Sequence, residues 1–286
     1  MKKNEKQNCK KEPNRRLYKI LGTVFAVAFV LCVCVSAGKS IREKRAQEKL
    51  EELAAESVLP EESMLPEATE KRETEARETE DPLEEFGIEV PEKQLDWELL
   101  KEENKDIYAW IYIPGTQVNY PVLQHETEDD YYLNRNLDGS SGYPGCIYTQ
   151  LLNSKDFTDR NTILYGHNMK NGTMFGSLHE YEDNTFFEEH PYVYIYTPDE
   201  TLVYEIFAAT TFSNAHLLYE YDFTDKNDLK RYLEDIADVR DMNSHVREDV
   251  SVDDEAYLLT LSTCIKNHPG NRWIISAILL NPPAAG

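Results

Sequence analysis

Cysteine and positive charge are both scarce in this sequence. Five cysteines in 286 residues are too few for a domain held together by disulfide bonds. Lys and Arg together number 30 against 53 Asp and Glu, so the formal net charge is -23. Phosphate groups repel such a chain, and we therefore expect no nucleic-acid partner. The hydrophobic content of 41% excludes disorder along the whole chain.

The charge is divided unevenly over three segments. Residues 1–42 contain ten basic and two acidic residues, which gives a net charge of +8. Residues 43–94 contain seven basic and 18 acidic residues, a net charge of -11. Residues 95–286 carry the remaining -20. These segments differ physically, so each is interpreted separately.

The stretch at 20–38 has no charged residue and reads ILGTVFAVAFVLCVCVSAG. A helix of about 20 apolar residues crosses about 30 Å of hydrocarbon, so we predict a transmembrane anchor here. Eight basic residues precede it, which predicts a cytoplasmic tail at 1–19, with the rest of the chain on the outer face of a single-pass cell-membrane protein. A cleaved signal peptide is the alternative, because small residues end the stretch at 35–38.

The segment 39–94 is rich in Glu, with repeats such as ETEARETEDPLEEF at 73–86. Large apolar residues are sparse, so the segment cannot bury enough surface to fold alone. We predict a charged linker or stalk, whose first part, to about residue 59, is compatible with a helix.

Residues 95–286 have the composition of one globular domain, rich in aromatic residues and interrupted by regular turn signals. Short helices are predicted at 95–104, 173–181 and 225–239. Seven short runs are typical of β-strands: 109–113, 146–149, 162–165, 192–197, 201–212, 256–263 and 272–280. Many short strands with few helices predict a mainly β fold, a closed or nearly closed barrel.

Two cysteines fall in this domain. Cys264 follows the apolar strand at 256–263 and precedes a predicted turn, so a thiol there is rigidly held and accessible to a substrate. Cys146 lies within a strand, where a small buried residue is the simplest interpretation. A disulfide between the two is the structural alternative.

A reactive thiol needs a basic partner, usually histidine. His167 follows the strand at 162–165, so it also leaves a strand end into a loop. Arg272 begins the last predicted strand, and a tight turn would bring it beside Cys264. A guanidinium in that position can stabilise an oxyanion, whereas the alternative is a surface arginine that balances nearby carboxylates.

Several motifs together resemble those of the sortases, membrane-anchored cysteine transpeptidases of Gram-positive bacteria. They are TLSTC at 260–264 with Arg272 downstream, and ILYGHN at 163–168. The resemblance is to class B, through YAWIYIPGTQVNYPVLQ at 108–124, YGHNMKNGTMFGSL at 165–178 and the helix at 225–239. It covers residues 95–280.

The resemblance implies an eight-stranded β-barrel as the sortase catalytic domain at 95–286. It implies that Cys264 is the nucleophile, His167 the general acid and base, and Arg272 the oxyanion or substrate-orienting residue. Asn168, Ser262 and Thr263 are secondary candidates for substrate contacts. Some class B members have an acidic residue two positions after the cysteine, where this chain has Lys266.

The implied activity is cleavage of a C-terminal sorting motif of the Asn-Pro-x-Thr type in a surface protein. The acyl group would form a thioester and then pass to an amine of peptidoglycan, either in the cross-bridge or in a lipid-linked precursor. The alternatives are a pilin-polymerising sortase, a peptidase that mainly hydrolyses, and a binding module without catalysis. The sequence has no convincing cluster of metal ligands, so we expect no metal and no cofactor.

Overall fold

A computed structural model describes residues 15–58, 83, 87–239 and 241–282. Most of the predicted basic tail and most of the acidic repeats of the predicted linker lie outside these residues. The chain divides into two compact units, residues 1–45 and 46–286.

The first unit contains the beginning of α1 (Arg15–Glu56). Its apolar part has a mean hydropathy of 2.2 over 18 residues, and large side chains such as Phe25 and Phe29 are exposed. Among the described residues, α1 is the one helix long and apolar enough to cross a membrane. A helix with exposed apolar side chains is the arrangement that the predicted anchor at 20–38 requires.

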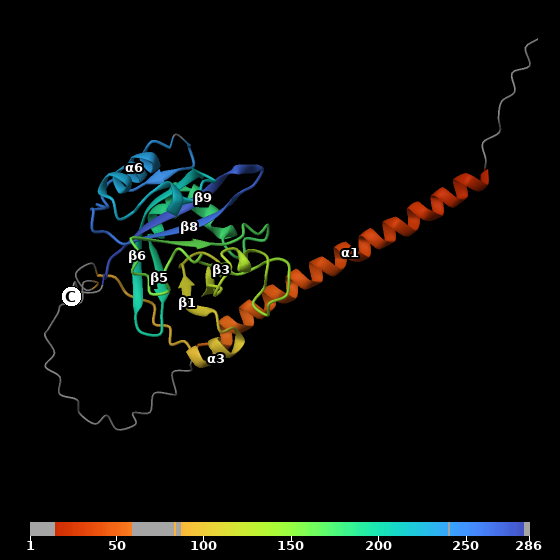
Figure 1. Ribbon diagram of the computed structural model, residues 1–286, viewed down its shortest axis with the longest axis horizontal. Helices are drawn as coiled ribbons and strands as arrows, with labels where there is room; N and C mark the ends of the chain where they lie inside the picture. The colour runs from red at the N-terminus through yellow and green to blue at the C-terminus, as the bar shows by residue number, and fades with distance from the viewer. Residues whose placement is uncertain (1–14, 59–82, 84–86, 240, 283–286) are drawn as a thin grey trace, which may run out of the picture. The chain divides into compact units, whose positions relative to one another are not determined.

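The second unit is a closed β-barrel. Its strands are β1 (Ile107–Tyr112), β2 (Asn119–Leu123), β3 (Ile147–Tyr148), β4 (Asn161–Tyr165), β5 (Tyr192–Tyr196), β6 (Thr201–Ser213), β8 (Leu258–Ile265) and β9 (His268–Leu279). They pair in the order β5-β1-β2-β3-β4-β8-β9-β6, and β6 pairs with β5 to close the barrel (Figure 1). The short strand β7 (His245–Val246) pairs only with β6. The prediction of a mainly β fold with an eight-stranded barrel is confirmed.

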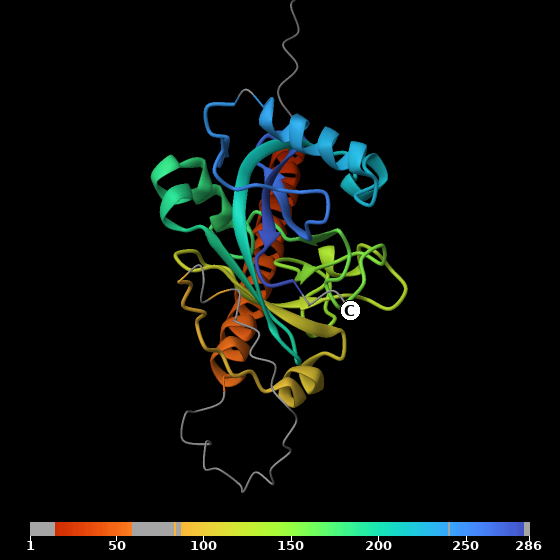
Figure 2. The same cartoon turned by 90° about the vertical axis from the view of Figure 1, so that its left-hand side faces the viewer.

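Short helices complete the unit. They are α3 (Trp97–Glu103), α4 (Asn184–Glu189), α5 (Leu217–Glu220), α6 (Lys226–Ala237) and the 3-10 helices η2 (Tyr131–Leu133) and η3 (Gly176–Glu182). Asp225 caps α6 by accepting hydrogen bonds from two backbone N–H groups, and Leu229, Tyr232 and Ile236 form its buried face. Figures 1 and 2 show α6 and α3 at opposite ends of the barrel.

Some local predictions were wrong for identifiable reasons. Strand β2 was not predicted, because Pro121 within it cannot donate to a ladder, although it pairs opposite Trp110 of β1. The helix predicted at 173–181 is instead η3, which is followed by α4. The turn predicted after Cys264 covers only residues 266–267, where Asn267 has a φ of 63°. Asparagine tolerates that left-handed conformation better than most residues.

The compact unit begins before residue 95, the predicted start of the domain. The last turns of α1 bury Leu50 and Leu53 in the barrel core, since residues three apart share one helix face. The following residues pair Val58 with Leu95, and Ser57 accepts a backbone hydrogen bond of 2.7 Å from Asp96. Part of the segment predicted as linker therefore packs against the barrel.

Candidate active site

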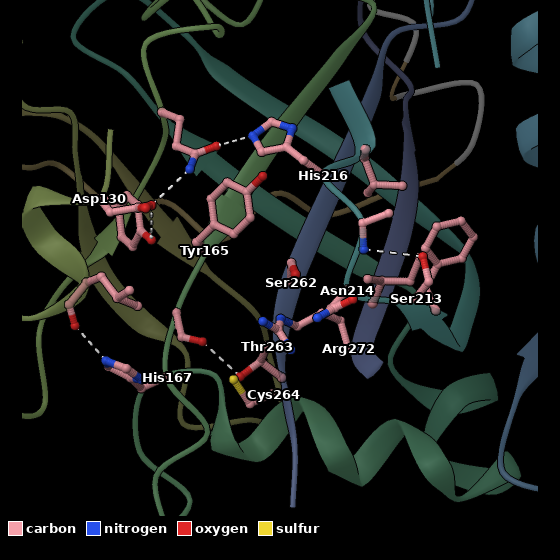
Figure 3. A pocket seen from close by; sticks show the side chains of 18 of the residues that line it. Asp130, Tyr165, His167, Ser213, Asn214, His216, Ser262, Thr263, Cys264 and Arg272 are labelled. Carbon is pink, nitrogen blue, oxygen red and sulfur yellow. Dashed lines mark hydrogen bonds between the residues drawn. The ribbon is translucent and has the colours of Figure 1, made fainter. Parts of the chain in front are cut away.

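Cys264 and Arg272 lie at facing positions on neighbouring antiparallel strands. Cys264 is near the end of β8, and its register partner on β9 is Arg272. The next pair is Ile265 with His268, so β9 contains a bulge of three extra residues between these pairs. The sequence placed both residues at one end of the sheet, and the observed register brings them together (Figure 3).

The guanidinium of Arg272 is held by the bulge that it follows. Its Nη1 donates to the carbonyl of Asn271 at 3.0 Å and to that of Pro269 at 3.3 Å. These bonds use one nitrogen of the five-donor group, and Arg272 still lines the pocket that contains Cys264. A charged donor with a fixed direction suits the stabilisation of an oxyanion.

His167 leaves the barrel at the end of β4. The N–H of Gly166, just before it, donates to the carbonyl of Ser262 at 3.2 Å. A side chain at Gly166 would collide with Ile147 and Phe175, which explains why glycine precedes the histidine. The ring of His167 lies 4.7 Å from that of Tyr143, and both line the same pocket as Cys264.

The imidazole of His167 is fixed by one hydrogen bond. Its Nε2 lies 2.6 Å from the carbonyl of Leu133. A carbonyl only accepts, so Nε2 carries the proton and Nδ1 is the basic nitrogen of the neutral ring. Burial lowers the pKa of His167 below its ordinary value, and the hydrogen bond to Leu133 opposes that shift. The neutral ring, which can accept the proton of a thiol, is thus favoured.

We expect the imidazole of His167 to titrate below pH 6.5, its ordinary value. The folded protein then binds this proton more weakly than the unfolded chain, so the contribution to stability is present above pH 6.5 and is lost as the pH falls through the folded pKa. An NMR titration of the ring resonances measures the midpoint. A midpoint at or above 6.5 would contradict the assignment of burial as the dominant cause.

The three secondary candidates have different environments. Thr263 donates through Oγ1 to the carbonyl of Gly166 at 2.8 Å, which ties β8 to the start of the His167 loop. Ser262 is buried and lines the pocket. Asn168 donates from Nδ2 to the carbonyl of Cys264 at 2.8 Å. Two of the three therefore make bonds within the protein itself.

Cys146 does not form a disulfide with Cys264. Both are free thiols, Cys146 buried and Cys264 exposed. Burial raises the pKa of the Cys146 thiol, so it is inert, as predicted for a small buried residue. Cys146 lies just before β3 and not within a strand. The predicted disulfide alternative is therefore wrong in this structure, and Cys264 is the accessible thiol of the barrel.

The pocket around these residues has a volume of about 460 Å³. Its far wall contains a chain of polar contacts: Gln150 donates to Asp130 at 2.9 Å, and its Oε1 lies 2.5 Å from Nε2 of His216 (Figure 3). The sequence did not predict this wall of the pocket, because Asp130, Gln150 and His216 come from three separate loops. His216 itself is half-buried.

The described residues contain no group of three or more His, Cys, Asp or Glu side chains that could hold a metal ion. The groups in the pocket with chemistry suited to acyl transfer are the thiol of Cys264, the imidazole of His167 and the guanidinium of Arg272.

A closed eight-stranded barrel with a thiol-bearing pocket at its rim is the architecture of cysteine transpeptidases of the sortase type. The family model described as "Sortase domain" matches residues 111–280, and the chain belongs to this family. The prediction of a sortase similar to class B is confirmed. Membership of this family makes the protein a sortase transpeptidase of the cell wall.

Two curated relatives are sortases B. The protein from Listeria monocytogenes is 33% identical over 183 residues, which cover 63% of this chain and 72% of the relative. The protein from Staphylococcus aureus is 34% identical over 171 residues, which cover 59% of this chain and 67% of the relative.

Solved structures of sortase B have the same fold. Sortase B from Bacillus anthracis in complex with AAEK1 is 34% identical, with a TM-score of 0.57 and coverage of 66% of this chain and 85% of that one. A Staphylococcus aureus sortase B–substrate complex is 29% identical, with a TM-score of 0.57 and coverage of 65% and 85%.

Proposed function

We propose that this protein is a membrane-anchored sortase that cleaves an Asn-Pro-x-Thr-type sorting motif and transfers the acyl group to an amine of peptidoglycan. The observation that carries the proposal is the facing pair of Cys264 and Arg272, with His167 lining the same pocket. Thiol, base and oxyanion donor are the three components that acyl transfer through a thioester requires.

The first half-reaction forms the acyl-enzyme. The thiol proton of Cys264 passes to His167, and Sγ attacks the carbonyl carbon of the peptide bond that is cleaved. Arg272 stabilises the oxyanion, the C–N bond breaks, and His167 gives its proton to the leaving amine. The carbonyl of Leu133 orients the imidazole through Nε2 during both proton transfers.

The second half-reaction resolves the thioester. An incoming amine attacks the carbonyl carbon, His167 accepts a proton from it, and Cys264 leaves as the thiol after taking that proton back. Arg272 stabilises the second oxyanion as it did the first. The net result is one peptide bond broken and one amide bond formed, with no cofactor.

The predicted anchor supports an external location of the barrel. Both proposed substrates, the sorting signal and the peptidoglycan amine, lie outside the cytoplasmic membrane. An uncleaved helix over 20–38 with eight preceding bases would keep the N-terminus inside and the barrel outside. The S. aureus structure described as a sortase B–substrate complex supports a peptide substrate, and another sortase B structure, described as complexed with triglycine, supports an amine partner.

We expect Arg272→Lys to lower kcat about 10²–10³-fold, the usual loss when one oxyanion donor is removed. Lysine keeps the charge but lacks the planar fork that the bulge carbonyls orient. The measurement is steady-state cleavage of a fluorogenic Asn-Pro-x-Thr peptide pool. Arg231→Lys on the exposed side of α6 is the matched control, and equal rates in the two variants would remove Arg272 from the mechanism.

A product assay separates transfer from hydrolysis. The full-length protein is incubated with the peptide pool alone, with triglycine, and with a peptide that presents a lysine ε-amine. We expect an amide product with triglycine that outweighs the free acid. Exclusive hydrolysis with both amines would favour the peptidase alternative, and transfer to the lysine peptide alone would favour the pilin-polymerising alternative.

A further inference from the structure

The backbone carbonyl of Cys264 lies beyond the end of a parallel ladder. Strands β4 and β8 pair up to Tyr165 opposite Ser262, and the carbonyl of Ser262 then accepts from Gly166. Carbonyls two residues apart point to the same side of a strand, so that of Cys264 faces the position where β4 would continue. The chain has turned away there into the His167 loop.

The side-chain amide of Asn168 takes the place of the missing ladder donor. Nδ2 of Asn168 donates to the carbonyl of Cys264 at 2.8 Å and lies 2.8 Å from Nε2 of His179. Nε2 of His179 is itself 3.1 Å from that carbonyl. Because the amide nitrogen has two hydrogens, Asn168 serves both acceptors at once when His179 is neutral.

His179 is held in this position from two other directions. Its Nδ1 lies 2.6 Å from Oε1 of Glu182, and the second carboxylate oxygen of Glu182 accepts from Asn243 at 3.3 Å. Its ring stacks on the buried Trp273, with centroids 5.8 Å apart and planes 22° apart. Trp273 in turn donates to the carbonyl of Leu178 at 2.9 Å, in the same turn of η3.

We propose that Asn168, His179 and Glu182 are positioning residues that fix the backbone of Cys264, so that its thiol stays aligned with His167 and Arg272. The proposal rests on the proposed function, in which Cys264 is the nucleophile. Cys264 needs such support because it is exposed and adjoins the bulge of β9. The regular pairing of β8 with β4 has already ended there. A displacement of about 1 Å at a reacting atom can cost about 10²-fold in rate.

Four variants of the full-length protein test this proposal. Asn168→Asp keeps the shape but replaces the donor by an acceptor that repels the carbonyl. His179→Ala removes the support of Asn168, whereas His179→Gln keeps a polar group near the position of Nε2. Asn171→Ala, in the same loop, is the control, because Asn171 bonds to Thr173 within the loop and to Gln117.

The readouts are kcat and KM with the Asn-Pro-x-Thr peptide pool, and iodoacetamide labelling of each cysteine read by peptide mapping. We expect kcat to fall about 10–100-fold in Asn168→Asp and about 10-fold in His179→Ala, with KM unchanged within about 2-fold. His179→Gln should stay within about 3-fold of the wild type. Cys264 should remain open to labelling, and the buried Cys146 should stay unlabelled, which reports an intact fold.

The proposal is overturned if Asn168→Asp and His179→Ala keep the kcat of the control, if the loss lies in KM alone, or if His179→Gln is as impaired as His179→Ala. If Cys146 becomes labelled in Asn168→Asp, the fold of that variant is disturbed. The kcat values of His179→Ala and His179→Gln then test the proposal. A failure of the proposed function is distinguishable, because the wild type itself would then leave the peptide pool uncleaved.

Discussion

Cys264→Ala is expected to abolish cleavage of the Asn-Pro-x-Thr peptide pool, with a loss of at least about 10⁴-fold. No other described thiol can replace it, since Cys146 is buried and Cys32 and Cys34 lie in the apolar helix. The side chain of Cys264 is exposed, so its truncation leaves no cavity in the core. Fluorogenic cleavage by the full-length variant measures the loss, and the melting temperature reports the fold.

Cys146→Ala is the matched control. It removes a buried thiol of the same barrel, just before β3. Because this is only a small change of core packing, the variant should retain the cleavage rate within a few-fold. Wild-type activity in Cys264→Ala, or loss of activity in Cys146→Ala with an intact fold, would contradict the assignment of the nucleophile.

His167→Ala is expected to lower kcat about 10²–10⁴-fold, the usual contribution of a positioned general acid and base. The loss has two parts, because the imidazole takes the proton of the thiol and returns it to the leaving amine. Single-turnover cleavage of the same peptide pool measures the acylation step directly. The acylation rate itself should fall, since the proton transfers belong to that step.

His268→Ala serves as the control for that variant. His268 is close to Cys264 in sequence but exposed, at the start of β9. It should keep the wild-type rate. An equal loss of activity in both histidine variants would contradict the assignment of His167 as the general acid and base.

The parts of the site that lie at strand ends were predictable from the sequence. Cys264, His167 and Arg272 each adjoin an apolar β-type run, and such runs fix where a side chain emerges at the rim of a barrel. The many short strands also predicted the barrel, and the helical pattern at 225–239 predicted α6.

The parts that depend on contacts between distant segments were not predictable. Gln150 and His216 meet although 66 residues separate them, and neither has a local motif. His179 has acidic neighbours in the sequence, Glu180 and Glu182, and such neighbours do not determine its burial. The Glu-rich composition around Leu50 and Leu53 similarly concealed two core residues, because composition averages over a helix whose faces differ.

The mass of the acyl-enzyme shows directly whether Cys264 carries the acyl group. Full-length wild-type protein is mixed with the Asn-Pro-x-Thr peptide pool in the absence of an added amine, quenched in acid, digested and mapped by mass spectrometry. We expect the N-terminal part of the cleaved peptide to be attached to Cys264 as a thioester, and Cys264→Ala to carry none. Cleavage with the acyl group on another residue, or with no covalent intermediate under conditions that preserve thioesters, would exclude Cys264 as the nucleophile.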